Sequence, residues 1–232
     1  MPFLYYGFGV DWTLFLVLPG ILLAMVAQYR VKSVYNRYQK VQAGNGLSAQ
    51  GVARQLLDKA GLDIPIDEVP GQLSDHYNPR SRSLGLSAGV SQSGSVAAIG
   101  VAAHEVGHAV QHAEGYWPFT LRNAIYPVVN IASQLAIPLL LLGLVLELFG
   151  LISIALVMYS SAIIFQVVTL PVEFNASRRA KAMLAAEGIL SNAELEQAGK
   201  VLNAAALTYV ASLLLSILQL MRLMAMAGRR RR

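Results

Sequence analysis

The chain has 232 residues, of which 55% are hydrophobic and only 13% are charged. So few charged residues cannot cover so much apolar surface in water, which excludes an ordinary soluble domain and indicates a membrane protein. The net charge of +5 comes from basic residues scattered along loops and one run at the C-terminus. This distribution favours membrane topology and lipid-headgroup contact over nucleic-acid binding. Because there is no cysteine, disulfides and thiolate metal ligands are excluded.

The first predicted element is a transmembrane helix within residues 1–29. Its apolar run covers residues 12–27 and is interrupted only by Pro19 and Gly20. The positive charge and the small-residue cleavage site of a secretory signal are both missing, so we expect the helix to stay uncleaved. Four basic residues follow it and place its C-terminal end in the cytoplasm: Arg30, Lys32, Arg37 and Lys40.

Residues 30–130 are predicted to form a part on the cytoplasmic side. Ser48 caps a short amphipathic helix that ends at Gly61 and buries one stripe of side chains: Val52, Leu56, Leu57 and Ala60. Residues 75–79 are typical of a turn. Residues 83–87 alternate as in a strand, which can hold an extended substrate if it forms a sheet edge.

The central motif lies in a predicted helix over residues 96–112, for which Ser95 is the N-cap. Within it, His104, Glu105 and His108 form the pattern H-E-x-x-H. Positions four apart lie on one face of a helix, so the two histidines can bind one metal ion. Glu105 can then reach a water on that ion, as in zinc peptidases. The alternative is that both histidines are ordinary packing residues.

The second half of the chain contains three further apolar runs. Two of them, separated by Gly150, predict a transmembrane hairpin over residues 131–170. Residues 171–203 are predicted to be a charged helix opened by Pro171 and a second helix with a capping box. Residues 204–232 combine a fourth apolar helix with a basic tail. If that helix spans the membrane, its basic tail lies outside the cell, against the positive-inside tendency. Whether the helix spans the membrane or only dips into it therefore stays open.

A catalytic zinc ion usually has three protein ligands, so a third is needed beside the histidine pair. The candidates are His112, Glu114, His76, Asp75 and Glu173. His112 does not complete the metzincin pattern, because Gln111 stands where glycine is required. Glu173 is favoured because it follows the hairpin, which brings the chain back to the membrane face that it left. The alternative for Glu173 is a solvated charge beside Arg178.

Three blocks of the sequence resemble the YugP-like family of bacterial membrane zinc metallopeptidases: residues 75–79, 102–109 and 171–180. The order of H-E-x-x-H, hairpin and glutamate is also similar to that of membrane-bound gluzincins of the HtpX type. In that type the hairpin is followed by Glu-x-x-x-Asp, whose glutamate is the third zinc ligand, and this resemblance implies the same role for Glu173. Ser177 stands where that type has the aspartate, which orients a ligand histidine. The resemblance therefore implies a weaker partner there, with Asn175 sharing the task.

These observations predict a mainly α membrane protein, a helical bundle with a zincin-like H-E-x-x-H helix and a small β element. Its predicted function is hydrolysis of peptide bonds in membrane or membrane-adjacent proteins. The roles assigned are Zn²⁺ binding by His104, His108 and Glu173, proton transfer by Glu105, and oxyanion stabilisation by His76 and Tyr77.

The protein is expected to be a multi-pass cell-membrane protein with its site on the cytoplasmic side. Its partners are protein or peptide substrates and the lipid bilayer, without nucleic acid, and the sequence carries no indication of oligomeric state. The alternative function is a non-catalytic membrane scaffold with a structural or vestigial zinc site. Glu105 argues against it, because a structural site has no use for a general base. A transporter is disfavoured because the apolar runs contain few ionisable residues.

Overall fold

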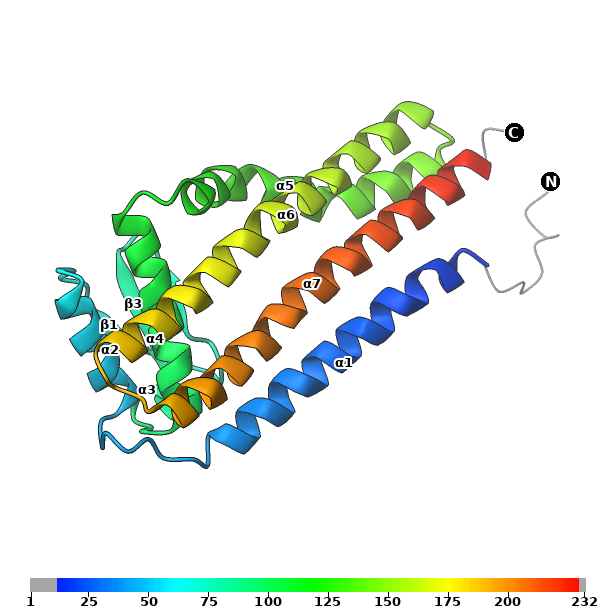
Figure 1. Cartoon of the computed structure of the whole chain (residues 1–232). Coiled ribbons are helices and arrows are strands. Elements are labelled where there is room, and N and C mark those ends of the chain that lie inside the picture. Colours follow the sequence, from blue (N-terminus) through cyan, green and yellow to red (C-terminus); the bar gives the residue numbers. More distant parts are fainter. Residues whose placement is uncertain (1–11, 230–232) are drawn as a thin grey trace.

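The computed structural model describes residues 12–229, so that residues 1–11 and the end of the predicted basic tail lie outside it. A small sheet packs against short helices at one end of the molecule, and long helices extend away from it (Figure 1). The elements, in chain order, are α1 (Leu14–Tyr38), α2 (Ala49–Lys59), β1 (Ile66–Val69), β2 (His76–Asn78), β3 (Ser83–Ser87), α3 (Ala88–Ser91), α4 (Val96–Ala113), α5 (Trp117–Val145), α6 (Phe149–Ala186) and α7 (Asn192–Arg229).

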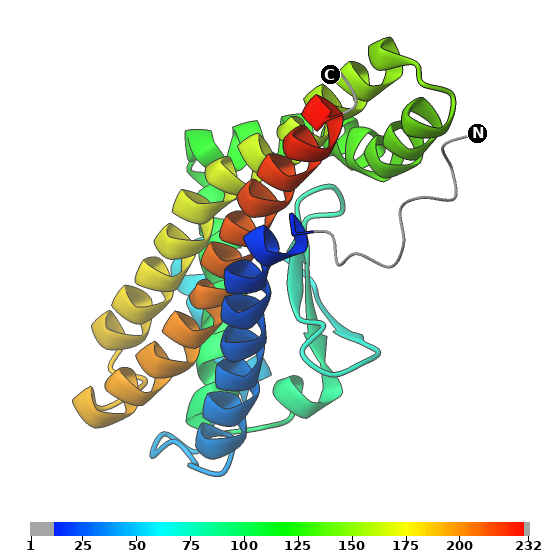
Figure 2. The same cartoon turned by 90° about the vertical axis from the view of Figure 1, so that its right-hand side faces the viewer.

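Four of the described helices, α1, α5, α6 and α7, are long and apolar enough to cross a membrane. They are arranged in a row, because α5 packs along α6, α6 against α7, and α7 against α1 (Figure 1). Figure 2 shows the same order for α6, α7 and α1 from a second direction. Gly20 permits the close approach of α1 to α7, since a Cβ there would lie 2.9 Å from the Cα of Leu215. The prediction of a mainly α membrane fold with a small β element is confirmed.

The second part of the fold is a compact unit of α2, the sheet, α3 and α4 at one end of the long helices. In the sheet, β3 lies between β1, which is parallel to it, and β2, which is antiparallel. Its apolar residues pack with those of α2 and α4 into one core that α6 and α7 complete. The fully buried residues of this core include Val52, Leu56, Leu57, Leu84, Leu86, Val96, Ile99, Val106, Val172 and Leu184.

Two predictions for the sheet are wrong. Residues 75–79 were expected to form a turn, but His76–Asn78 is strand β2, paired with β3. The turn follows the strand, where the Asn78 side chain accepts from the amides of Arg80 and Ser81. Residues 83–87 do form a strand, yet β3 lies in the middle of the sheet and offers no free edge for a substrate. The edge strand next to α4 is β2, which pairs with β3 along one edge and is unpaired along the other.

The helix boundaries differ from the predicted ones in the membrane part. The hairpin turns at residues 146–148, where Glu147 has a φ of 57°, whereas Gly150 is inside α6. Pro171 does not open a new helix, because α6 continues through it. Neighbouring helices allow a membrane helix to accommodate proline in this way. Ala60 was predicted to belong to the buried stripe of α2, but it directly follows the helix and is exposed. Ala53 is buried in that stripe instead.

Candidate metal and active site

Helix α4 brings the H-E-x-x-H residues against α6. Its first turn is capped by Ser95, whose hydroxyl accepts from the amide of Ala98. The contact with α6 is unusually close at Gly107, where a Cβ would lie 2.7 Å from the carbonyl oxygen of Ala176. Only glycine fits at this position. The approach places Glu173, one turn before Ala176 on α6, beside the two histidines.

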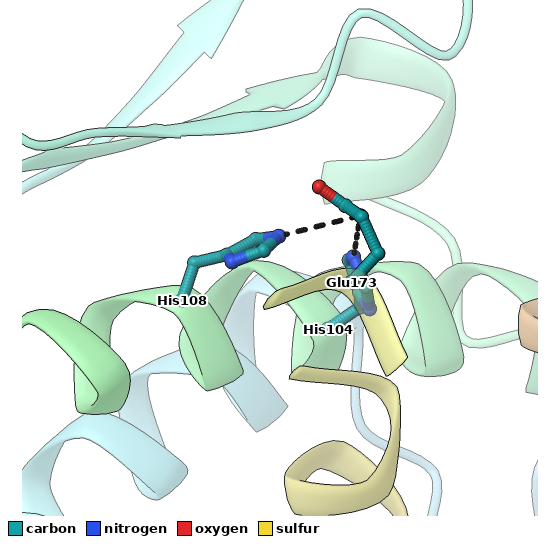
Figure 3. Close-up of side chains that lie close together, drawn as sticks. All are labelled: His104, His108 and Glu173. Carbon is teal, nitrogen blue, oxygen red and sulfur yellow. Dashed lines mark hydrogen bonds and ion pairs between the residues drawn. The ribbon is translucent and has the colours of Figure 1, made fainter. Parts of the chain in front are cut away.

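Three side chains converge at this contact: His104 and His108 from α4 and Glu173 from α6 (Figure 3). Oε2 of Glu173 lies 3.3 Å from Nε2 of His104 and 3.7 Å from Nε2 of His108. In a tetrahedral site with zinc–ligand bonds of about 2.0–2.2 Å, two ligand atoms are about 3.4 Å apart. Two imidazole nitrogens and one carboxylate oxygen are also a donor set that zinc prefers. The residues therefore fit a zinc ion.

Each of the two histidines also has a hydrogen-bond partner at its other ring nitrogen, Nδ1. Only part of these contacts was predicted from the sequence. Gln111, which is fully buried, contacts Nδ1 of His108 through its Oε1 at 2.9 Å. Its amide nitrogen donates to the carbonyl of Val172 and to Oδ1 of Asn175, so its oxygen must be the acceptor. This fixes the proton on Nδ1 and leaves Nε2 free for a metal.

His104 is held in the same manner by the serine that replaces an aspartate. Oγ of Ser177 lies 3.1 Å from Nδ1 of His104. Asn175 acts on the other histidine, through Gln111, so each of the two residues supports one member of the pair. Gln111 itself was considered only as a mismatch to the metzincin pattern. Its position three residues after His108, on the same helix face, was the signal for this contact.

Arg122 of α5 reaches the site from the membrane part of the fold. Its Nη1 lies 3.2 Å from Oε1 of Glu173, the carboxylate oxygen that does not face the histidines. Arg122 could not be identified from the sequence, because 51 residues separate it from Glu173 and no motif connects the two.

Glu105 lies next to the three converging residues and is almost completely buried. Its Oε2 accepts a hydrogen bond of 2.9 Å from the backbone amide of Tyr77 in β2. Burial raises the pKa of the Glu105 carboxyl above its ordinary value, and the neighbouring Glu173 and Asp75 carboxylates act in the same direction, while His104 opposes them. A glutamate with a raised pKa and a fixed orientation is suited to accept and return a proton near neutral pH.

The remaining predicted site residues lie around this centre in different settings. The Tyr77 hydroxyl is 2.8 Å from Nδ1 of His112, and Asp75 accepts hydrogen bonds from Ser87. Glu114 forms an ion pair with Arg179. His76 is exposed, with Nδ1 2.9 Å from the Ser74 carbonyl oxygen. Among the described residues, Glu173 is the third-ligand candidate that comes together with the two histidines.

The centre opens into a cavity of about 750 Å³ between β2, α4, α5 and α7. Its lining includes His76, Tyr77 and Glu105 together with Arg122. Tyr209 of α7 also lines this cavity. It was not identified from the sequence, where it is one aromatic residue in a long apolar run.

Comparisons with known proteins agree with this geometry. A sequence profile described as "Putative neutral zinc metallopeptidase" matches residues 13–228. A protein of Bacillus subtilis (strain 168), described as "Putative membrane protease YugP", is 47% identical over 210 residues, which cover 90% of this chain and 93% of that protein. No solved structure matches the chain. The predicted resemblance is confirmed, and the chain belongs to the family of these neutral zinc metallopeptidases.

Proposed function

We propose that this protein is a zinc metalloendopeptidase that hydrolyses membrane or membrane-adjacent proteins. The observation that carries the proposal is the meeting of His104, His108 and Glu173 around one point, with the Glu105 carboxylate beside it. A structural zinc site has no need of a general base, whereas a hydrolase does. The family to which the chain belongs supports the same activity.

In this mechanism, His104, His108 and Glu173 would hold the zinc ion, which when bound would acidify water and polarise a carbonyl group. Glu105 accepts the proton of the attacking water and later delivers it to the leaving amine. The Tyr77 amide holds the Glu105 carboxylate in the orientation that both transfers need. Arg122 fixes Oε1 of Glu173, so that Oε2 stays directed at the two histidines.

The oxyanion formed at the scissile carbonyl needs a further hydrogen-bond donor, and we assign this role to His76 with help from Tyr77. The ring of His76 lines the cavity and is exposed there. The Tyr77 hydroxyl is 2.8 Å from Nδ1 of His112 and its amide N–H donates to Glu105, so Tyr77 helps by fixing the position of β2, which carries His76. A His76→Ala variant should then lose kcat with KM almost unchanged, because the interaction forms only in the transition state.

We place the active site at the cytoplasmic surface of the cell membrane, because basic residues gather at the C-terminal end of α1, where it reaches the compact unit. Since α7 is antiparallel to α1, the C-terminal end of α7 is then on the opposite side of the membrane. The absence of cysteine makes this testable by labelling single cysteines. A Ser81→Cys variant should react with an impermeant maleimide only in inside-out vesicles, and reaction in intact cells contradicts this orientation.

The function is tested by elemental analysis of the purified protein together with casein hydrolysis. Near-stoichiometric zinc and hydrolysis are expected for the wild type, and both should be lost in Glu173→Gln. Glu105→Gln should keep the zinc and lose the hydrolysis. Glu196→Gln, an exposed position in α7 paired with Lys200, is the matched control. A wild-type protein without zinc and without hydrolysis supports the scaffold function instead.

A further inference from the structure

A second cavity continues from the active site into the membrane part of the fold. It has a volume of about 400 Å³ and lies between α5, α6 and α7. It shares four lining residues with the active-site cavity, namely Arg122, Tyr126, Phe165 and Tyr209. The two cavities therefore adjoin each other at these four residues. We call the part between the three long helices the polar groove, for the residues described next.

The polar groove is lined by hydrogen-bonding side chains although it lies within apolar helices. These side chains are Asn130, Ser133, Gln166, Thr169 and Ser212. Their neighbours on the outer face are exposed apolar residues, such as Val128, Ile164 and Val167. Polar groups are thus turned toward the groove and away from the surface that faces lipid. Polar residues inside membrane helices are costly and in general mark a functional path.

One of these groups has an unused acceptor. Nε2 of Gln166 donates to Ser216, but Oε1 of Gln166 is buried without a hydrogen-bond partner in the described part of the chain. A lipid acyl chain cannot supply the missing donor. The interior of a regular helix cannot supply it either, because the backbone N–H groups there are already bonded. An unwound peptide segment carries free N–H groups and fits this requirement.

We infer that the polar groove receives the end of a substrate's transmembrane segment, which unwinds there and leads its peptide bond to Glu105. This rests on the proposed peptidase function and specifies its substrates as membrane proteins cleaved close to a membrane span. Gln166 and Glu173 are seven residues apart on α6, or about 10 Å at the helical rise per residue. Since an extended chain covers this distance in about three residues, the cleaved bond lies a few residues beyond the part held in the groove.

The first test compares one casein segment in two forms, free and joined to a transmembrane helix of about 20 Leu and Ala residues. In proteoliposomes, the wild type should cleave the anchored form with a kcat/KM about tenfold or more above that of the free form. A Ser212→Phe variant should lower this ratio about fivefold or more, because a bulky side chain fills the groove. Ser153→Phe, which changes an exposed serine of α6 that does not line the groove, is the matched control and should keep the ratio.

The second test does not depend on hydrolysis and uses the absence of cysteine in the chain. In the Glu105→Gln background, Ser212→Cys should form a disulfide with a cysteine near the end of the anchored reporter's helix, whereas Ser153→Cys should not. Two outcomes would contradict substrate binding in the groove and leave the peptidase function standing. One is equal crosslinking at both positions, and the other is no crosslinking at Ser212→Cys while the wild type hydrolyses the free segment. Crosslinking confined to Ser212→Cys, with no hydrolysis of either form by the wild type, overturns the peptidase function and retains the groove as a binding site.

Discussion

Arg122 and Glu173 form an ion pair on the carboxylate oxygen that the two histidines leave free. The separation is 3.2 Å, and Glu173 is only 3% exposed. Because the other oxygen faces His104 and His108, the arginine determines which edge of the carboxylate is presented to a metal. A residue from α5 thus completes a site whose other members come from α4 and α6.

The role of this pair can be tested with Arg122→Lys, which keeps the positive charge and loses the planar guanidinium. The zinc dissociation constant should rise about tenfold, as is usual when the partner of a metal ligand is disturbed. Competition with a chromophoric chelator measures this constant. Arg178→Lys, at an exposed position on α6, the helix that carries Glu173, should bind zinc like the wild type. If Arg122→Lys and the wild type bind zinc equally well, Arg122 does not support metal binding and its role is in contacts with the substrate.

Gln111→Leu should affect both the fold and the metal. The substitution removes three hydrogen bonds at a fully buried position and leaves His108 Nδ1 without its partner. The free energy of unfolding should fall by about 1–3 kcal/mol, and zinc affinity should fall about 10–100-fold. Denaturant unfolding of the apoprotein separates the first effect from the second. Gln92→Leu, at an exposed position, is the control, and a similar loss there would argue against a specific role of Gln111.

Much of the site could be predicted because it depends on local periodicity. The histidine pair requires only helical spacing within α4, and Ser95 and the apolar runs act through neighbouring residues. Gln111 and Arg122 were missed for opposite reasons. The signal of Gln111 was present in its spacing from His108, whereas Arg122 meets Glu173 only through the packing of α5 on α6. Such contacts are set by how helices pack, which short sequence patterns do not encode.

The errors in the fold have a common physical origin. Pro171 and the stretch before Pro79 contain residues that break regular structure in an isolated chain. In the folded protein, neighbouring helices accommodate the proline in α6, and pairing with β3 makes a strand of residues 76–78. Long-range contacts override local preference at both places.

Gly107→Ala tests whether the close contact of α4 with α6 assembles the site. The added methyl group would lie 2.7 Å from the carbonyl oxygen of Ala176, which is backbone and cannot rotate away. We expect a loss of about 1–3 kcal/mol in stability and weaker zinc binding, because the helices must separate. Gly199→Ala is the control, since its methyl group meets Lys181 at an ordinary 3.5 Å. It should be neutral or stabilising by up to about 1 kcal/mol. Thermal unfolding with and without zinc measures both effects.

Acidification should destabilise the protein through His112. Burial lowers the pKa of His112 below its ordinary value of 6.5, and nearby Arg82 lowers it further. The folded state therefore binds this proton more weakly than the unfolded state. The stability that neutral His112 contributes is complete above pH 6.5 and is lost as the pH falls from there through the folded-state pKa.

The prediction is checked by comparing the wild type with His112→Gln, both without zinc, in thermal unfolding between pH 7.5 and pH 5, a range of about two units around the ordinary pKa of histidine. The melting temperature of the wild type should fall more steeply on acidification, because protonated His112 also loses the acceptor that faces the Tyr77 hydroxyl. Parallel curves for the two proteins would assign the acid sensitivity to other groups.

The length of helix α6 has a mechanical consequence for the candidate metal site. The helix runs without interruption from the hairpin turn to Ala186, so that Glu173 is fixed to a rod of about 57 Å, most of which is apolar and suited to lie in the bilayer. The histidines belong to α4, which is anchored in the compact unit with the sheet. A change in bilayer thickness that tilts the apolar part of α6 therefore acts on the close contact of Ala176 with Gly107, which holds Glu173 beside the histidines. The membrane-spanning length of one helix and the geometry of the candidate metal site are thus linked through a single backbone contact.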